Sequence, residues 1–269
     1  MPLTSTGIAY DRAGPIGDVP LVLIHAGIAD RRMWEPQWAA LTLERDLIRL
    51  DLRGYGESTD RPDGDLAPVD DVIETLTELE IERVHLIGAS FGAGVAVEVA
   101  LTRPSLVESL LLSAPGGSLI PDMTAQLRGF VEAEDAALDR DDLDAAVAAN
   151  LTTWVDGQGS PPTRVDPGVR ALVGRMQRRA FELTDDWDDV EEAELDPPAL
   201  DRLPEVAVPT LVLMGAFDLD AIHDAAGRVT AGIDSAQRVD WSDVAHLPSM
   251  ERPDDFSALI DEWVSPGRR

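Results

Sequence analysis

The chain has 269 residues, of which 44% are hydrophobic, a length that suits one α/β domain with an insertion better than two independent domains. It carries 51 acidic against 22 basic residues and a formal charge of −29, so repulsion disfavours nucleic acid, anionic membranes and polyanionic ligands. Because cysteine is absent, disulfides, thiol nucleophiles and thiolate metal sites are excluded.

The N-terminal residues 1–17 predict a single strand, near residues 6–10, because they are too short for a two-stranded hairpin. They show neither a basic region nor an apolar signal-peptide core, and no run of about 18 apolar residues occurs in the chain. We therefore expect a soluble, cytoplasmic protein.

Short apolar runs alternate with longer stretches of helical periodicity, a pattern typical of a mostly parallel sheet with helices on both faces. Apolar residues recur at three- and four-residue intervals in 70–79, which predicts a helix with one buried face. Pro253 with Asp254 and Asp255 indicates the start of a C-terminal helix over 253–264. The predicted strands are 21–24, 47–50, 84–87, 109–113, 210–214 and 237–241.

A serine lies at a tight turn between the third of these runs and a helix-like stretch. The sequence there is Gly88-Ala89-Ser90-Phe91-Gly92. Glycines two residues on either side let a strand and a helix approach closely, so that the serine hydroxyl projects from a strained turn, the arrangement called a nucleophile elbow. Ser90 is therefore the candidate nucleophile.

The segment 118–207 lacks long β-branched runs and shows helical patterns at 122–134, 141–155, 167–183 and 198–203. We expect a helical cap over Ser90, with the core formed by 1–117 and 208–269. Arg170, Arg175, Arg178 and Arg179 on one predicted helix could clamp a substrate carboxylate or pair with neighbouring acids. The candidates to line a pocket beneath the cap are Trp34, Leu119, Met123, Phe130, Trp154 and Phe181.

A serine hydroxyl needs a base to take its proton, usually a histidine held by a carboxylate. In the hydrolase fold that this strand–turn–helix sequence resembles, the acid follows the serine in the chain and precedes the histidine. Of the four histidines, His25 and His85 come before the serine. His223 is excluded because it lies too near in the chain to Asp218, the candidate acid, for the two to stand on separate strand ends. His246, directly after the strand 237–241, is therefore the candidate base. We interpret His25 as a structural residue that braces its loop.

The candidate acid is Asp218, because it follows the strand 210–214 through a short Gly-Ala-Phe turn. Asp220 is the competing choice, and Asp240 and Asp243 crowd the histidine loop. Attack by the serine would give a tetrahedral intermediate with a negatively charged oxygen, which two backbone N–H groups should stabilise. One of these groups is predicted at Phe91. The other is predicted at Gly27, in the loop after strand 21–24, with Ile28 as the alternative.

These motifs resemble those of the α/β-hydrolase superfamily over nearly the full length. His25-Ala26-Gly27 is similar to its oxyanion loop, 51–58 to its Arg-Gly-x-Gly-x-Ser turn, and 246–253 to its histidine motif. The chain departs from the family at Ala26 and Ala245, where glycine is usual. The resemblance implies an α/β-hydrolase fold with a helical cap, as in esterases, enol-lactonases, carbon–carbon bond hydrolases and cofactor-free haloperoxidases. The serine at the elbow argues against haloalkane dehalogenases and epoxide hydrolases, which have aspartate there.

The resulting hypothesis is a serine hydrolase that cleaves a small, neutral carboxylic ester or lactone through an acyl-enzyme on Ser90. Carbon–carbon bond hydrolysis or perhydrolysis on the same triad, or a ligand-binding receptor on a hydrolase scaffold, are the alternatives. We expect no cofactor and, because the histidines show no ligand spacing, no metal. The expected partner is a small-molecule substrate, and the protein is expected to be a monomer or a homodimer.

Overall fold

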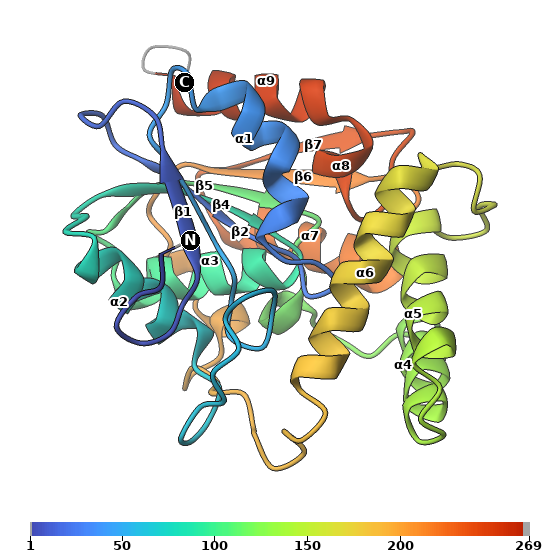
Figure 1. The fold of residues 1–269 in the computed structure, drawn as a ribbon. Helices are drawn as coiled ribbons and strands as arrows, with labels where there is room; N and C mark the ends of the chain where they lie inside the picture. The colour runs from blue at the N-terminus through green and yellow to red at the C-terminus, as the bar shows by residue number, and fades with distance from the viewer. Residues whose placement is uncertain (1, 266–269) are drawn as a thin grey trace.

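A computed structural model describes residues 2–265 of the chain. At its centre lies a seven-stranded sheet in the order β1-β3-β2-β4-β5-β6-β7 (Figure 1). β1 pairs antiparallel with β3, and every other neighbouring pair is parallel, as the sequence predicts. The strands are β1 Tyr10–Ala13, β2 Leu21–Ile24, β3 Leu47–Leu50, β4 Val84–Ala89, β5 Val107–Ser113, β6 Thr210–Gly215 and β7 Ala236–Trp241.

The first strand differs from the prediction, because β1 begins at Tyr10 instead of near residue 6. A tight turn occupies the predicted position: the N–H of Gly7 donates to the carbonyl of Thr4 at 3.0 Å, and the N–H of Thr4 to the carbonyl of Ile8 at 2.9 Å. Gly7 has a φ of 86°, a left-handed conformation that glycine adopts without strain. The turn reverses the chain before it joins the sheet.

Helices cover both faces of the sheet (Figure 1). One face carries α1 Glu35–Leu41, α8 Pro248–Glu251 and α9 Pro253–Val264, preceded by the 3-10 helix η1 Arg31–Trp34. The other carries α2 Pro68–Glu78, α3 Phe91–Thr102 and α7 Asp220–Gly232. The inner strands β2 and β6 are buried along their whole length, and they are almost entirely apolar instead of alternating. The edge strands β1 and β7 are only partly buried and contain charged residues.

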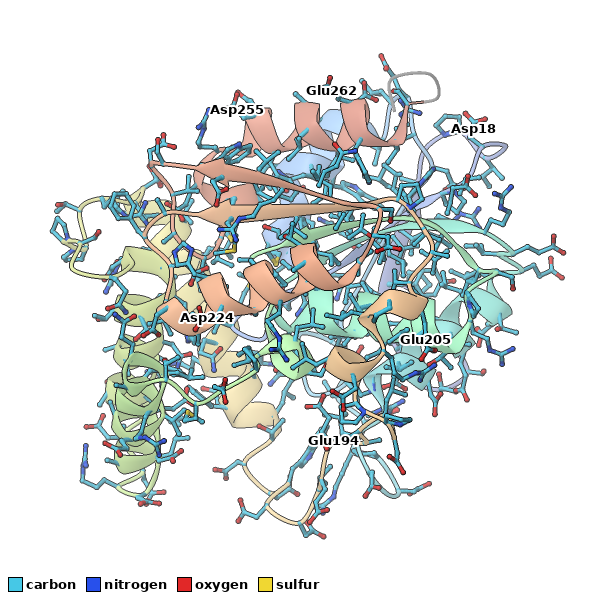
Figure 2. All side chains as sticks on the ribbon, turned by 180° about the vertical axis from the view of Figure 1, so that it is seen from behind. Asp18, Glu194, Glu205, Asp224, Asp255 and Glu262 are labelled. Atoms are coloured by element: carbon cyan, nitrogen blue, oxygen red, sulfur yellow. The ribbon has the colours of Figure 1, made fainter. Side chains whose placement is uncertain are left out.

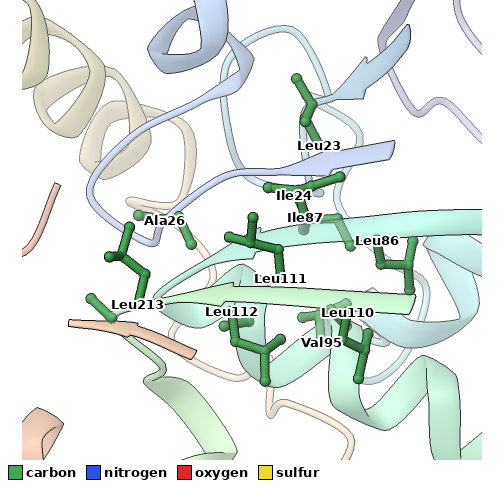
Figure 3. Packing of buried hydrophobic residues seen from close by; sticks show 14 of the residues in the cluster. Leu23, Ile24, Ala26, Leu86, Ile87, Val95, Leu110, Leu111, Leu112 and Leu213 are labelled. Carbon is green, nitrogen blue, oxygen red and sulfur yellow. The ribbon is translucent and has the colours of Figure 1, made fainter. Parts of the chain in front are cut away.

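The core is continuous from the strands into α3. Figure 3 shows Ile87 of β4 beside Leu111 of β5 on one face of the sheet, and Leu110 of β5 with Val95 of α3 on the other. Residues 92–101 of α3 are buried on all sides of the helix, which explains why this stretch has little polar periodicity. The rigid strand–helix unit carries Ser90 at its junction.

The segment between β5 and β6, hereafter the inserted segment (residues 118–207), is mostly helical. Its long helices, between residues 125 and 183, lie to one side of the sheet beside the ends of the strands (Figure 1). Side chains of Thr124, Asp142 and Asp166 cap its three main helices by accepting backbone N–H bonds. The helix predicted at 122–134 therefore starts later, and the one predicted at 198–203 is two short 3-10 turns. The elements are η2 Gly117–Leu119, α4 Ala125–Leu138, α5 Leu143–Asn150, the π-helical turn η3 Leu151–Asp156, α6 Pro167–Leu183, η4 Ala199–Asp201 and η5 Leu203–Glu205.

Within residues 2–265, no helix combines the length and the apolar character needed to cross a bilayer.

Candidate active site

Ser90 stands at the junction of β4 and α3 in a strained backbone conformation, with φ 51° and ψ −115°. A non-glycine residue in this region costs on the order of 1–3 kcal/mol and is held there only by its surroundings. Here the Ser90 N–H donates to the carbonyl of Ser113 at 2.9 Å, and its carbonyl accepts from Gly116 at 3.1 Å. The neighbouring strand β5 and the loop after it thus fix the turn.

The two glycines of the turn permit a close approach of backbones. A Cβ at Gly92 would lie 2.5 Å from the carbonyl oxygens of both Ile24 and His25, at the end of β2. A Cβ at Gly88 would lie 2.3 Å from the Gly92 carbonyl oxygen. The first residues of α3 can therefore lie directly against the end of β2 only because these positions have no side chain.

The structure brings Ser90, His246 and Asp218 into one hydrogen-bonded chain. His246 Nε2 lies 2.7 Å from Ser90 Oγ, and His246 Nδ1 lies 2.7 Å from Asp218 Oδ2. The histidine is 2% exposed and the aspartate 4%. With Nδ1–H donating to the carboxylate, Nε2 is left as an acceptor for the serine hydroxyl proton, the tautomer that a general base requires.

The competing acid has a different position. Asp220 begins α7, where its Oδ1 accepts from Thr124 Oγ1 at 2.6 Å and from the Ala221 N–H at 2.8 Å. Asp240 pairs with Arg238, and Asp243 pairs with Arg252. Asp218, whose other oxygen accepts the Leu219 N–H at 2.8 Å, is the carboxylate on the histidine.

The two predicted oxyanion donors lie beside each other. A Cβ built on Gly27 would be 3.5 Å from the Phe91 Cβ. Phe91 begins α3, so its N–H has no intrahelical acceptor, and the helix N-terminus favours negative charge. Gly27 and Ile28 both line the cavity that contains Ser90.

His25 is fully buried below this loop, and backbone groups occupy both of its ring nitrogens. Nδ1 lies 2.9 Å from the Ala26 carbonyl oxygen, and Nε2 accepts the Leu52 N–H at 2.9 Å. These bonds fit only a neutral ring protonated at Nδ1, and burial lowers the pKa of the imidazole. His25 thus ties the predicted oxyanion loop to the turn after β3.

A cavity of about 400 Å³ lies above Ser90 and His246, between the sheet and the inserted segment. The His246 ring packs on Trp154 at 4.5 Å between centroids, and Trp154 packs on Phe130 at 5.1 Å. The wall is mostly apolar, with a few polar side chains, which is usual for small-molecule sites. Its apolar side chains are Ile28, Leu66, Ile120, Leu127, Phe130, Trp154, Ala180, Phe181, Trp187 and Ile222.

Of the six residues predicted to line the pocket, Phe130, Trp154 and Phe181 do so, and three lie elsewhere. Trp34 is fully buried in the core and packs on Phe256 of α9 at 5.9 Å. Leu119 is also fully buried in the core, and Met123 is 50% exposed. Hydrophobicity near a site motif does not separate core-facing from cavity-facing side chains, because the direction depends on the local turn.

The four arginines predicted on one helix do not line this cavity. Arg170 pairs with Asp156 at 2.8 Å, and Arg178 pairs with Asp144. Among residues 2–265, no group of three or more histidine, aspartate or glutamate side chains is placed to hold a metal ion.

The cavity also has polar lining residues that were not predicted from the sequence. Tyr55 follows β3, and burial, with smaller effects from Glu192 and Glu134, raises the pKa of its hydroxyl far above the usual range. Arg53 is engaged in an ion pair with Asp71 at 2.6 Å. The other polar lining residues are Glu134, Asn150, Gln177 and Thr184, all on the inserted segment. Their helical periodicity relative to Phe130, Trp154 and Phe181 is the signal that could have found them.

A model of the alpha/beta hydrolase family matches residues 21–259, and the chain therefore belongs to this family of hydrolases. This finding confirms the predicted fold class and the predicted class of enzyme. The solved structure of a thermophilic esterase from Thermogutta terrifontis is similar, with a TM-score of 0.75 and 25% identity over 96% of this chain and 92% of that one.

Two curated proteins show different extents of similarity. A putative carbamate hydrolase from Rhizobium rhizogenes is 25% identical over 90% of this chain and 92% of its own length. The dihydrolipoyllysine-residue acetyltransferase component of an acetoin cleaving system from Pseudomonas putida is 39% identical over 45% of this chain. The match spans about a third of the length of that relative, 33%.

Proposed function

We propose that the protein hydrolyses a small carboxylic ester or lactone through an acyl-enzyme on Ser90. The observation that carries the proposal is the hydrogen-bonded chain from Ser90 through His246 to Asp218, with 2.7 Å at each step, at the floor of a mostly apolar cavity. The likeness to an esterase supports the same reaction class.

In the first half-reaction, Ser90 Oγ attacks the carbonyl carbon and His246 Nε2 takes the hydroxyl proton. The carbonyl oxygen becomes an oxyanion that the N–H groups of Gly27 and Phe91 stabilise. His246 then gives the proton to the departing alkoxide. In the second half-reaction, a water attacks the acyl-enzyme by the same steps, releasing the acid and restoring Ser90.

The inserted segment acts as a cap in this proposal. Its aromatic pair, Trp154 and Phe130, covers His246, and a cap of this kind limits water around the acyl-enzyme and shapes the substrate pocket. The charge of −29 favours neutral over anionic substrates.

The test is hydrolysis of a series of p-nitrophenyl esters of increasing acyl length by the wild type and by Ser90→Ala. We expect kcat to fall by about 10⁴–10⁶-fold in the variant. His246→Ala and Asp218→Asn should also lose activity, whereas the matched controls His223→Ala and Asp220→Asn should retain most of it. Equal turnover by wild type and Ser90→Ala would refute the mechanism, and tight ligand binding without turnover of any ester or lactone would favour a receptor.

A further inference from the structure

The cavity has a polar end, formed by Glu134 of α4, Asn150 of α5 and Gln177 of α6. The helices α4 and α5 form an antiparallel hairpin joined by residues 139–142 (Figure 1). Glu134 follows Phe130 by four positions in α4, so their backbones lie one helical turn, about 5.4 Å, apart along the axis. Asn150 ends α5, directly before the π-helical turn that carries Trp154. The two aromatic rings beside this polar pair pack on each other, and Trp154 packs on His246.

The side chains at this end present hydrogen-bond acceptors. Asn150 Nδ2 donates to Glu134 Oε1 and also to the Ala146 carbonyl oxygen at 3.0 Å. Both N–H bonds of this amide are therefore used, and its carbonyl oxygen is the atom that remains for a ligand. The contact also fixes the Glu134 carboxyl group in the wall of the cavity.

Gln177 supplies the strongest indication of a ligand. It is 6% exposed, it lines the cavity, and its Oε1 is buried with no hydrogen-bond partner. Nearly all buried polar atoms in folded proteins are paired, so an unpaired acceptor beside a cavity is explained if a small rotation of the side chain brings it to a donor on a ligand. Nothing in the proposed hydrolytic steps uses this side chain.

The charge around this end excludes an acidic ligand. Phe181 and Thr184 separate the cavity from an adjoining hollow, which is lined by Asp139, Asp141, Asp185 and Asp188. The inserted segment as a whole has 21 acidic against 8 basic residues. A carboxylate or phosphate here would meet Glu134 and these aspartates without a free cation in the cavity lining, since Arg53 is paired with Asp71.

We propose that the polar end binds a hydrogen-bond donor, a hydroxyl, amide N–H or ammonium group, carried by the substrate on the side remote from the scissile carbonyl. Gln177 and Asn150 accept from this donor, and Glu134 adds a preference for positive charge. This inference rests on the proposed function, because the bound molecule is taken to be the substrate of that reaction. Binding at the polar end can nevertheless be measured without turnover. The inserted segment, which supplies these three side chains, then determines the class of substrate.

The first test compares p-nitrophenyl esters whose acyl chains have equal length and end in methyl, hydroxyl, ammonium or carboxylate. We expect the wild type to show kcat/KM at least about tenfold higher for the hydroxyl or ammonium ester than for the methyl ester, and lowest for the carboxylate. Gln177→Met, which keeps the side-chain volume, should lose the preference for the donor. The exposed Gln237→Met serves as the matched control and should keep it.

Glu134→Gln distinguishes the two kinds of donor. This variant should keep the preference for hydroxyl over methyl and lose any additional preference for ammonium. Equal kcat/KM for the methyl and hydroxyl esters in wild type, or a donor preference that survives in Gln177→Met, would overturn the proposal.

A binding measurement separates this inference from the proposed reaction. Non-hydrolysable amides with the same chain ends are titrated into Ser90→Ala and into Ser90→Ala/Gln177→Met by calorimetry. In Ser90→Ala, donor-terminated amides should bind at least about tenfold tighter than methyl-terminated amides. In Ser90→Ala/Gln177→Met, the two kinds of amide should bind with equal affinity. That result would support the polar subsite even if no ester were turned over, and equal affinities in both proteins would overturn it.

Discussion

At the scale of single residues, the close packing around Ser90 depends on the absence of side chains at the turn. Gly92 and Gly129 are both helical glycines, in α3 and α4, and they differ in their surroundings. A Cβ at Gly92 meets two backbone oxygens at 2.5 Å, whereas a Cβ at Gly129 meets nothing within 4 Å. The pair therefore separates a steric effect from a general effect of helix propensity.

We expect Gly92→Ala to destabilise the protein by about 2 kcal/mol or more and to lower activity, because β2 and α3 must move apart. Gly129→Ala should be neutral or stabilise by up to about 1 kcal/mol, since alanine is the better helix former. Urea unfolding and ester hydrolysis check both variants. Similar stability in the two variants would contradict this account of the turn.

Glu98 is a buried carboxyl group on α3, 5% exposed. Burial raises the pKa of this group above 4.5, and repulsion from Glu194 adds to the effect, while the Ser118 side chain opposes it. The native state then holds the proton more tightly than the unfolded state, so this residue lowers stability as pH rises through 4.5 toward the native pKa. Its contribution is unfavourable at neutral pH.

Glu98→Gln should therefore raise the free energy of unfolding at pH 8, on the order of 1 kcal/mol, the usual scale for a buried polar group. The gain should shrink as pH falls toward 4.5, where the glutamate is protonated in both states. Urea unfolding at pH 5 and pH 8 measures the difference. A gain that is larger at pH 5 than at pH 8 would show that the sign of the pKa shift is wrong.

At the scale of elements, Arg164 joins the inserted segment to the loop that carries His246. Its guanidinium donates to the carbonyls of Val155 at 2.8 Å and Asp156 at 2.7 Å, and it pairs with Glu251. Glu251 in turn accepts the Ala245 N–H at 2.9 Å, directly before the histidine. The pair is nearly buried, with side chains 13% and 6% exposed.

Arg164→Met should cost about 3 kcal/mol of stability, because it leaves Glu251 buried without its partner, and burial already raises the pKa of this carboxyl group. It should also lower kcat/KM. Arg164→Met/Glu251→Gln should recover part of the stability. The control Arg178→Met, which breaks an exposed pair, should change stability by less than about 1 kcal/mol. Thermal and urea unfolding provide the readout, and equal losses in the two single variants would exclude this role for Arg164.

Periodicity predicts the elements well where burial is uniform. The runs at 21–24 and 47–50 are strands with the predicted bounds. The helix α6 covers the predicted 167–183, because Asp166 caps its start and apolar residues recur along one of its faces. Periodicity predicts one helix at 141–155, whereas the structure has α5 followed by the π-helical turn Leu151–Asp156. This turn carries Trp154, which packs on His246.

The candidate site likewise contains residues that the sequence predicts and residues that it does not. Ser90, His246 and Asp218 could be proposed because their positions follow strand ends, and strand ends of a parallel sheet share an edge. The polar lining from Glu134, Asn150 and Gln177 requires the relative placement of three helices. Helical periodicity can indicate that each of these residues shares a helix face with an aromatic residue, but the meeting of the three faces at one cavity depends on tertiary packing.

At the scale of the whole molecule, carboxylates cover the surface. In Figure 2, labelled acidic side chains lie on α7, on η5, at two positions of α9 and on two loops; they are Asp224, Glu205, Asp255, Glu262, Asp18 and Glu194. With a net charge of −29 the folded state contains many like charges at short range, and unfolding lets them separate. Self-repulsion should therefore be a measurable cost of folding at low ionic strength.

We expect NaCl or KCl to raise the free energy of unfolding by on the order of 1–2 kcal/mol between 0.05 and 0.5 M, because the screening length falls from more than about 10 Å to less than about 8 Å. For a chain of this size each kcal/mol corresponds to roughly 2–4 °C in Tm. Asp18→Asn/Glu194→Gln/Asp224→Asn is the matched variant, since all three side chains are exposed. It should be more stable than wild type at low salt and respond less to added salt. A flat salt response would mean that exposed ion pairs such as Arg252–Asp255, which salt weakens, offset the repulsion. An equal response in both proteins would show that the three substituted carboxylates do not contribute to it.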